Sequence, residues 1–184
     1  WVGRALAAEG FLTLAPDYRL YPEVSYPTFL EDGAKAIAWA VENAARYGGD
    51  PRQIVLIGHS AGAYNAVMLG LERSYLQAAG VDPSRIRAVA GLAGPYDFLP
   101  LKGETVRGVF GGAPDLAATQ PINQVDGAAP PAFLARGPAG AGGGGGDAGL
   151  SRPRPCRCSA GPVQAPARAS AGPGGHDRLS APPH

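Results

Sequence analysis

At residues 53–62 the chain reads Gln53-Ile54-Val55-Leu56-Ile57-Gly58-His59-Ser60-Ala61-Gly62. The run from Gln53 to Ile57 is short, apolar and bounded by turn residues, which is typical of a buried strand. The segment from Ala61 to about Ala79 is apolar on nearly all sides in its first half, which predicts a helix enclosed by the core. The pattern between them is G-x-S-x-G. The sequence therefore predicts a serine on a sharp turn that leads from a central parallel strand into a helix.

The residues around this serine have a chemical interpretation. A strained turn brings the backbone close to its neighbours, so we expect Gly58 and Gly62 to lack side chains for steric reasons. The turn lifts the Ser60 hydroxyl above the C-terminal edge of the sheet, where open α/β sheets bind ligands. The N–H of Ala61 opens the helix without an intrahelical acceptor and suits a developing oxyanion. We predict Ser60 as a catalytic nucleophile, Ala61 as an oxyanion donor, and His59 as a packing residue that points away.

Helical and strand patterns alternate on both sides of this turn. A helix begins at Thr28 with a capping box to Glu31, and its apolar residues recur every three to four positions. The other predicted elements are a helix at 2–9 ended by Gly10, a buried strand at 11–15, strands at 86–92 and 132–135, and a short helix at 104–110. This order predicts an α/β fold in which a parallel sheet carries helices on both faces.

The composition divides the chain of 184 residues into two parts. Residues 1–136 carry the alternating pattern and are predicted to form one domain. In residues 137–184, 20 of the 48 residues are Gly or Pro, and the large apolar side chains are Leu150, Val163 and Leu179. Such a segment buries too little apolar surface to offset its chain entropy. We therefore expect residues 137–184 to form a disordered low-complexity tail.

Composition also narrows the class of function. The formal net charge of +1 does not indicate a nucleic-acid-binding protein, and no apolar run approaches the roughly 18 residues of a membrane span. Cys156 and Cys158 both lie in the tail, and their spacing is interpreted as incidental rather than as a disulfide or metal site. We expect no metal and no cofactor. The sequence leaves the compartment and the oligomeric state open.

Several motifs in residues 1–136 form a recognisable set. They are Asp17-Tyr18-Arg19-Leu20-Tyr21-Pro22-Glu23, Pro27, Leu30-Glu31-Asp32, Gly58 to Gly62, and Gly94-Pro95-Tyr96-Asp97-Phe98. Together they resemble the esterase/lipase branch of the α/β-hydrolase superfamily, which includes hormone-sensitive-lipase-like carboxylesterases and relatives of kynurenine formamidase. The resemblance implies hydrolysis of a small-molecule carboxylic ester through a Ser–His–acid triad, with Ser60 as nucleophile and the Ala61 amide as one oxyanion donor. It also places Asp17, Arg19 and Glu23 in a loop near the site.

The sequence departs from this family at both ends. The family's His-Gly-Gly oxyanion loop and its flanking early strands precede the region that begins here at Trp1, which indicates an N-terminal truncation. The family's acid and base follow the strand at 132–135, where this chain changes abruptly to Gly, Pro, Ala and Arg. We interpret this change as a shifted reading frame near Arg136. Asp147 and His176 are then weak candidates for acid and base, and Asp97 is a second candidate for the acid.

Three readings of function follow. The first is a serine hydrolase of the carboxylic-ester type whose activity is impaired in this chain. The second is an amidase or formamidase that uses the same triad. The third is a catalytically inactive fragment, or a binding protein that keeps the hydrolase fold.

Overall fold

The computed structural model describes residues 2–136, so the predicted tail at 137–184, with Asp147 and His176, lies outside the described residues. Helices and strands alternate along the described chain, as the sequence predicts. In chain order the elements are α1 (Val2–Ala8), α2 (Thr28–Asn43), the 3-10 helix η1 (Ala44–Tyr47), β1 (Ile54–His59), α3 (Ala61–Leu71), α4 (Ser74–Ala78), η2 (Pro83–Arg85), β2 (Ile86–Leu92), α5 (Glu104–Phe110), η3 (Pro121–Gln124) and β3 (Ala132–Ala135).

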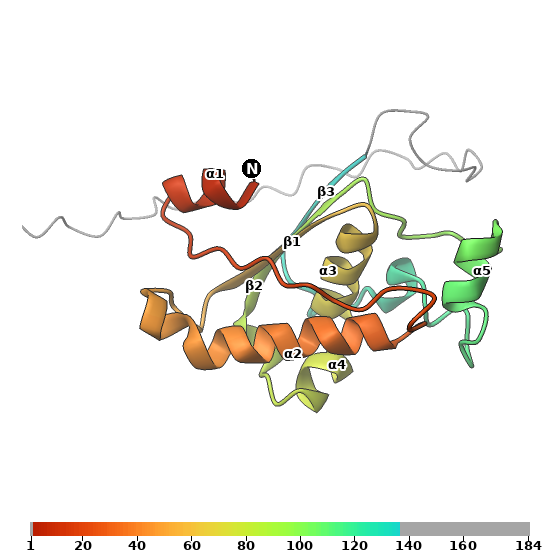
Figure 1. Ribbon diagram of the computed structural model, residues 1–184, viewed down its shortest axis with the longest axis horizontal. Coiled ribbons are helices and arrows are strands. Elements are labelled where there is room, and N and C mark those ends of the chain that lie inside the picture. The colour runs from red at the N-terminus through yellow and green to blue at the C-terminus, as the bar shows by residue number, and fades with distance from the viewer. Residues whose placement is uncertain (1, 137–184) are drawn as a thin grey trace, which may run out of the picture. The chain divides into compact units, whose positions relative to one another are not determined.

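The three strands form one parallel sheet in the order β1-β2-β3. β1 aligns with β2 so that Gly58 lies opposite Gly91, and β2 aligns with β3 so that Gly91 lies opposite Leu134. In Figure 1, α1 lies on one side of the sheet, and α2, α3 and α4 lie on the other. This arrangement confirms the predicted α/β class.

The hydrophobic core lies between the sheet, α3 and α2. Helix α3 is buried at every position from Ala63 to Gly70, as the apolar sequence of this segment predicts. Helix α2 buries Leu30, Ala34 and Ile37 along one stripe, with exposed fractions of 8 % or less. Each buried leucine or isoleucine contributes about 1.5–3 kcal/mol relative to an exposed one. The packing of α2 on α3 and of α3 on the sheet therefore holds the start of α3 in place.

The predicted strand at 11–15 is wrong. Residues 11–20 have no regular secondary structure, and Phe11, Leu12 and Leu14 are 40–52 % exposed. A strand exists only through hydrogen bonds to a neighbouring strand, and no segment within residues 2–136 pairs with this run. For the same reason β1 is an edge strand among the described residues, whereas the sequence predicts a central one. The central position is taken by β2.

Two further details of the helices differ from prediction. The helix expected from Ala61 to about Ala79 is interrupted after Leu71, because Glu72 has an extended backbone and its side chain accepts a hydrogen bond from the Ser74 N–H at 3.0 Å. The capping box at Thr28 is also absent. Pro27 takes the N-cap position, and no side chain caps the helix.

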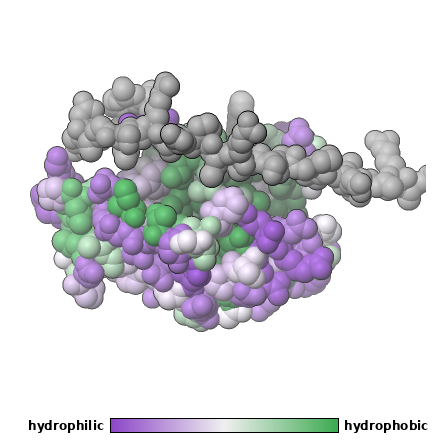
Figure 2. Space-filling model, turned by 180° about the vertical axis from the view of Figure 1, so that it is seen from behind, coloured by the Kyte–Doolittle hydropathy of each residue, from purple (hydrophilic) through white to green (hydrophobic). Residues whose placement is uncertain are grey.

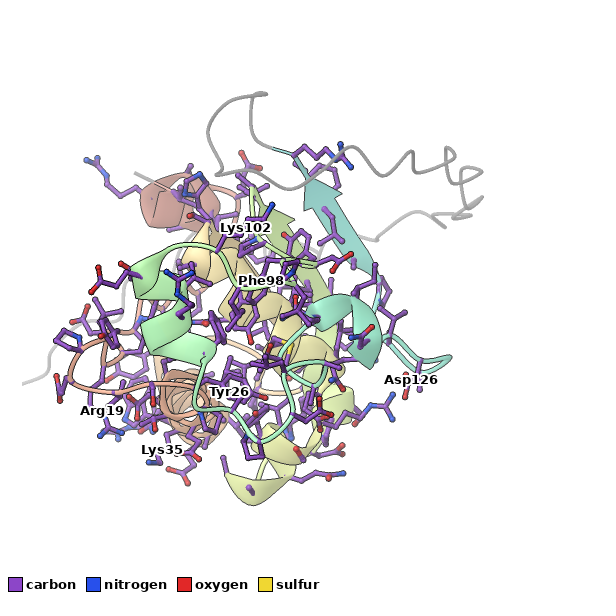
Figure 3. The ribbon with its side chains drawn as sticks, turned by 90° about the vertical axis from the view of Figure 1, so that its right-hand side faces the viewer. Arg19, Tyr26, Lys35, Phe98, Lys102 and Asp126 are labelled. Carbon is purple, nitrogen blue, oxygen red and sulfur yellow. The ribbon has the colours of Figure 1, made fainter. Side chains whose placement is uncertain are left out.

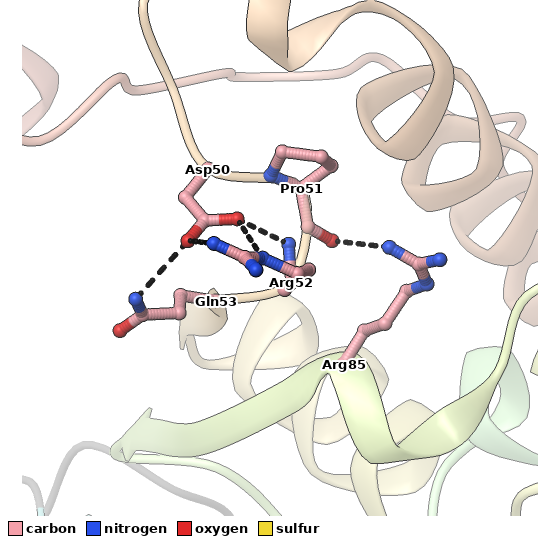
Figure 4. A network of polar contacts seen from close by, with 5 residues as sticks. All are labelled: Asp50, Pro51, Arg52, Gln53 and Arg85. Carbon is pink, nitrogen blue, oxygen red and sulfur yellow. Dashed lines mark hydrogen bonds and ion pairs between the residues drawn. The ribbon is translucent and has the colours of Figure 1, made fainter.

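A polar network fixes the turn that precedes β1 (Figure 4). The Asp50 carboxylate accepts hydrogen bonds from the backbone and guanidinium of Arg52, at 2.9–3.0 Å, and from the Gln53 amide at 3.2 Å. These donors hold the pKa of Asp50 well below its ordinary value. The Arg85 guanidinium donates to the Pro51 carbonyl at 3.0 Å. Because Arg85 directly precedes β2, this bond ties together the starts of the two paired strands.

Apolar side chains also reach the surface of the sheet. Val55 and Ile57 in β1 are 40 % and 43 % exposed, and Phe133 in β3 is 65 % exposed. Figure 2 shows apolar surface interspersed with polar surface on the rear of the molecule. None of the helices within residues 2–136 has the length and apolar character needed to cross a membrane.

The segment after α5 is anchored by a buried glutamine. Gln120 is 1 % exposed, and its carbonyl oxygen accepts a hydrogen bond from the Phe98 N–H at 2.8 Å. Its amide nitrogen donates to the Thr119 hydroxyl at 2.7 Å, and that hydroxyl donates to the Leu116 carbonyl. Gln120 thus joins η3 to the loop that follows β2.

We predict that Gln120→Leu lowers the free energy of unfolding by about 1–3 kcal/mol, because it leaves the Phe98 N–H without an acceptor and removes the hydrogen bond that the Thr119 hydroxyl accepts. Gln124→Leu is the matched control. The Gln124 side chain is only half-buried and donates one bond, to the Ala118 carbonyl. Its replacement should cost less than about 1 kcal/mol. Chemical denaturation of both variants tests this, and equal losses would contradict the anchoring role of Gln120.

Candidate active site

Ser60 lies at the turn between β1 and α3, as the sequence predicts. Its backbone has φ 53° and ψ −120°, a conformation that L residues rarely adopt. Such strain costs about 1–3 kcal/mol and persists only where the surrounding structure imposes it. The Ser60 N–H donates a hydrogen bond of 2.8 Å to the Leu92 carbonyl at the end of β2, and the residue is exposed. The hydroxyl is therefore carried at the C-terminal edge of the sheet.

The backbone groups around Ser60 start helix α3 and leave one N–H group, that of Ala61, without an acceptor among residues 2–136. The Ser60 carbonyl accepts hydrogen bonds from the N–H groups of Ala63 at 3.0 Å and Tyr64 at 3.2 Å, which starts α3. Ala61 is the first residue of α3, and nothing within residues 2–136 accepts a hydrogen bond from its N–H. A free N–H at the positive end of a helix dipole can stabilise an anion. This turn thus places a hydroxyl beside an unpaired donor.

The two glycines of the motif differ in their surroundings. A Cβ on Gly58 would collide with the Gly62 carbonyl and lie 2.6 Å from the Ala63 nitrogen. A Cβ on Gly62 would meet nothing within 4 Å outside the backbone of its own helix. The steric requirement predicted for Gly58 is therefore present, and the one predicted for Gly62 is wrong. The Cβ position of Gly62 points away from β1, whereas the Gly62 carbonyl points toward Gly58.

The candidate acids and bases are not brought together within the described residues. His59 ends β1 opposite Leu92 and is exposed; it is the single histidine of residues 2–136. Asp97 is exposed on the loop after β2. Hydrogen bonds hold the residues on either side of it to η3, from the Ile122 N–H to the Tyr96 carbonyl at 3.1 Å and from the Phe98 N–H to Gln120. No sequence motif indicated that the Gln120 side chain would bind the loop after β2.

The loop that carries Asp17, Arg19 and Glu23 is fixed by an ion pair. The Arg19 guanidinium donates two hydrogen bonds to the Asp32 carboxylate, at 2.7 and 2.9 Å, and the Arg19 N–H adds a third at 3.2 Å. These bonds hold the pKa of Asp32 below its ordinary value. Arg19 is thus engaged in holding the loop to α2. An open, shallow hollow lined by residues 17–20, Glu23 and Asp32 lies beside it.

An aromatic cluster that the sequence analysis missed surrounds the first turns of α3. Tyr64 follows Ser60 by one helical turn, and its ring lies 5.3 Å from that of Phe110 and 5.9 Å from that of Phe98, centroid to centroid. The Tyr64 hydroxyl donates to the Thr119 carbonyl at 2.8 Å, and burial raises its pKa. Phe98 and Tyr26 belong to the same cluster beside α5 (Figure 3). Their scattered positions in the chain gave no periodic signal.

No group of three or more His, Cys, Asp or Glu residues in the described part of the chain is placed to hold a metal ion. The polar groups at the strand–helix turn are a hydroxyl and backbone amides.

Comparison with known proteins matches the chain to one family and to several esterases. The sequence profile of the BD-FAE family matches residues 2–140. The chain is 38 % identical over 98 residues to Esterase LipC of Mycobacterium tuberculosis, covering 50 % of this chain and 24 % of that protein. It is 32 % identical over 104 residues to the isoprenylcysteine alpha-carbonyl methylesterase of Arabidopsis thaliana, covering 54 % of this chain and 24 % of that protein.

A solved structure of Thermogutta terrifontis esterase 2, phosphoramylated by tabun, superposes with a TM-score of 0.59 at 23 % identity. The superposition covers 72 % of this chain and 50 % of that chain, and shows that the two share a fold. The chain spans about a quarter of the length of the curated relatives it matches.

We predict that Gly58→Ala and Gly62→Ala change stability in opposite directions. The methyl group of Gly58→Ala overlaps backbone atoms of α3, so we expect a loss of about 3 kcal/mol or more. The methyl group of Gly62→Ala is accommodated, and alanine favours a helix over glycine by up to about 1 kcal/mol. Thermal or urea unfolding of the two variants measures both effects. A loss at Gly62 as large as that at Gly58 would contradict the asymmetry of the turn.

Proposed function

Because this chain belongs to the BD-FAE family and has the α/β-hydrolase fold of its esterase relatives, we propose that it is built to hydrolyse carboxylic esters with Ser60 as the nucleophile. The observation that carries this proposal is the strained backbone of Ser60, at φ 53°, on an exposed turn between a parallel strand and a buried helix. A bystander serine would gain nothing from this conformation, whereas a nucleophile must be presented to a substrate above the sheet.

The chemistry assigned to the turn is acyl transfer in two steps. The Ser60 hydroxyl oxygen attacks the ester carbonyl carbon while its proton passes to a base, and the carbonyl oxygen becomes an oxyanion. The Ala61 N–H donates a hydrogen bond to this oxyanion, which in a preorganised site contributes about 2.7–4 kcal/mol per donor. Collapse expels the alcohol, which takes up a proton, and leaves an acyl ester on Ser60. Water then attacks that ester and releases the carboxylic acid.

The described residues supply no base for this reaction. His59 is the last residue of β1 and directly precedes Ser60, and alternation along a strand directs neighbouring side chains to opposite sides. Asp97 is the acid candidate within residues 2–136, and Asp147 and His176 lie outside them. We propose that the activity of this chain is impaired for this reason. The substrate class is a small carboxylic ester, in keeping with the names of the esterase and methylesterase relatives.

A formamidase or amidase would use the same serine and the same oxyanion donor on a C–N bond, and the turn alone does not favour it over an ester. The leaving amine must be protonated, so an amide demands more of the acid than an activated ester does. An inactive binding protein is the remaining alternative. Binding alone does not require a serine in a strained backbone conformation, so the geometry of Ser60 does not favour this alternative.

We predict that the purified chain hydrolyses a short-chain p-nitrophenyl ester slowly, and that Ser60→Ala and His176→Ala each leave this slow rate almost unchanged. Triad members act as a unit worth on the order of 10⁶-fold in a serine protease, so a chain without the base keeps only the small rate that oxyanion stabilisation and substrate binding supply. Robust turnover that is lost in both variants would show that His176 completes a triad, and would overturn the proposed impairment.

A fluorophosphonate probe separates the alternatives. Slow labelling of the wild-type chain that Ser60→Ala removes supports a serine hydrolase. Labelling that occurs at other residues and persists in Ser60→Ala would contradict the proposed role of Ser60 and favour the binding protein.

A further inference from the structure

Tyr96 lies in a slot between the end of β2 and the first turns of α3. A Cβ on Gly91 would collide with the Tyr96 hydroxyl oxygen, and one on Gly94 would lie 2.7 Å from the same oxygen. The Cβ position at Gly94 is also 2.8 Å from the Ala63 Cβ, and that at Gly91 is 3.0 Å from Val67. The absence of side chains at Gly91 and Gly94 thus leaves the space that the phenol ring occupies against α3.

The backbone around this slot is strained in two adjacent places. Ala93, like Ser60, has a φ of 53°, in a region that non-glycine residues rarely adopt. The Ser60 N–H bonds to the Leu92 carbonyl, and the Ala93 N–H bonds to the Ala135 carbonyl at 2.8 Å. The two strained residues therefore meet at the same edge of the sheet. The turn at Ala93 leads the chain back so that Tyr96 reaches Gly91.

We infer that Tyr96 is a positioning residue that holds the Ser60–Ala61 turn against the end of β2. Its ring separates the start of α3 from β2 by a fixed distance, and that distance sets the length of the Ser60–Leu92 hydrogen bond. The backbone of Tyr96 is itself bound to η3, because its carbonyl accepts a hydrogen bond from the Ile122 N–H. This inference rests on the proposed function, since it assigns Tyr96 a role through the serine of that site.

The ring rather than the hydroxyl carries this role. The Tyr96 hydroxyl is buried and makes no hydrogen bond of ordinary geometry with a described residue. Leaving such a group unpaired costs about 1–3 kcal/mol. Phenylalanine at this position would remove that cost and keep the ring in the slot. A smaller side chain would empty the slot and free α3 to move toward β2.

The test compares Tyr96→Leu and Tyr96→Phe by amide hydrogen exchange, followed by NMR. In Tyr96→Leu we expect the Ser60 amide to exchange on the order of tenfold faster, with shifted Ser60 and Ala61 amide resonances. The Val89 amide, which donates to the Pro131 carbonyl at 3.0 Å, is the internal reference. A general loss of stability would accelerate both amides, whereas a loss of positioning accelerates Ser60 alone. Tyr96→Phe should keep the wild-type exchange ratio and resonances.

Tyr75→Leu is the matched control, because Tyr75 is a half-buried tyrosine on α4 whose hydroxyl donates to that of Tyr26 at 3.0 Å. It should leave the ratio of Ser60 to Val89 exchange unchanged. Equal acceleration of both amides in Tyr96→Leu, or the same selective effect in Tyr75→Leu, would overturn the inference. Exchange does not require turnover, so the positioning role and the proposed function can each fail alone.

Discussion

The geometry at the C-terminal edge of the sheet depends on one close approach, between Gly58 in β1 and the Gly62 carbonyl in α3. No side chain fits between them, so the chain must leave the strand and enter the helix within one residue, Ser60. The strain in Ser60 is the consequence. It is sustained by burial of α3 along its whole middle, from Ala63 to Gly70, which prevents the helix from moving back.

The remaining loops at this edge are tied to the same point. The Ser60 N–H bonds to Leu92 in the neighbouring strand, and the Ala93 N–H bonds to Ala135 in the next, so a line of hydrogen bonds crosses the ends of all three strands. The buried Gln120 side chain fixes the loop after β2, because its carbonyl oxygen accepts a hydrogen bond from the Phe98 N–H. A substrate above the sheet would therefore meet a surface whose backbone is constrained from several directions. Such constraint keeps donors aligned without reorganisation during reaction.

The sequence predicted the local elements well where a single periodic pattern determined them. The limits of β2, α5 and β3 agree with prediction because each is a short run bounded by turn residues. The segment at 11–15 has an equally apolar run, yet forms no strand, since strand formation requires a partner that a local pattern does not report. The serine turn was predictable from its motif. The different surroundings of Gly58 and Gly62 were not predictable from the sequence. Both are glycines, and they differ only in the direction in which a Cβ atom would point.

The outer edge of β1 lacks the features that usually protect a sheet edge. From Ile54 to His59 the strand contains no lysine, proline or acidic residue, the residues that usually protect an exposed edge from other chains. Within the described sheet, β1 pairs on one side only, and Val55 and Ile57 are exposed on it. The outward backbone amides of β1 thus have no strand partner among residues 2–136. An edge of this composition is the type on which a further strand can extend a sheet.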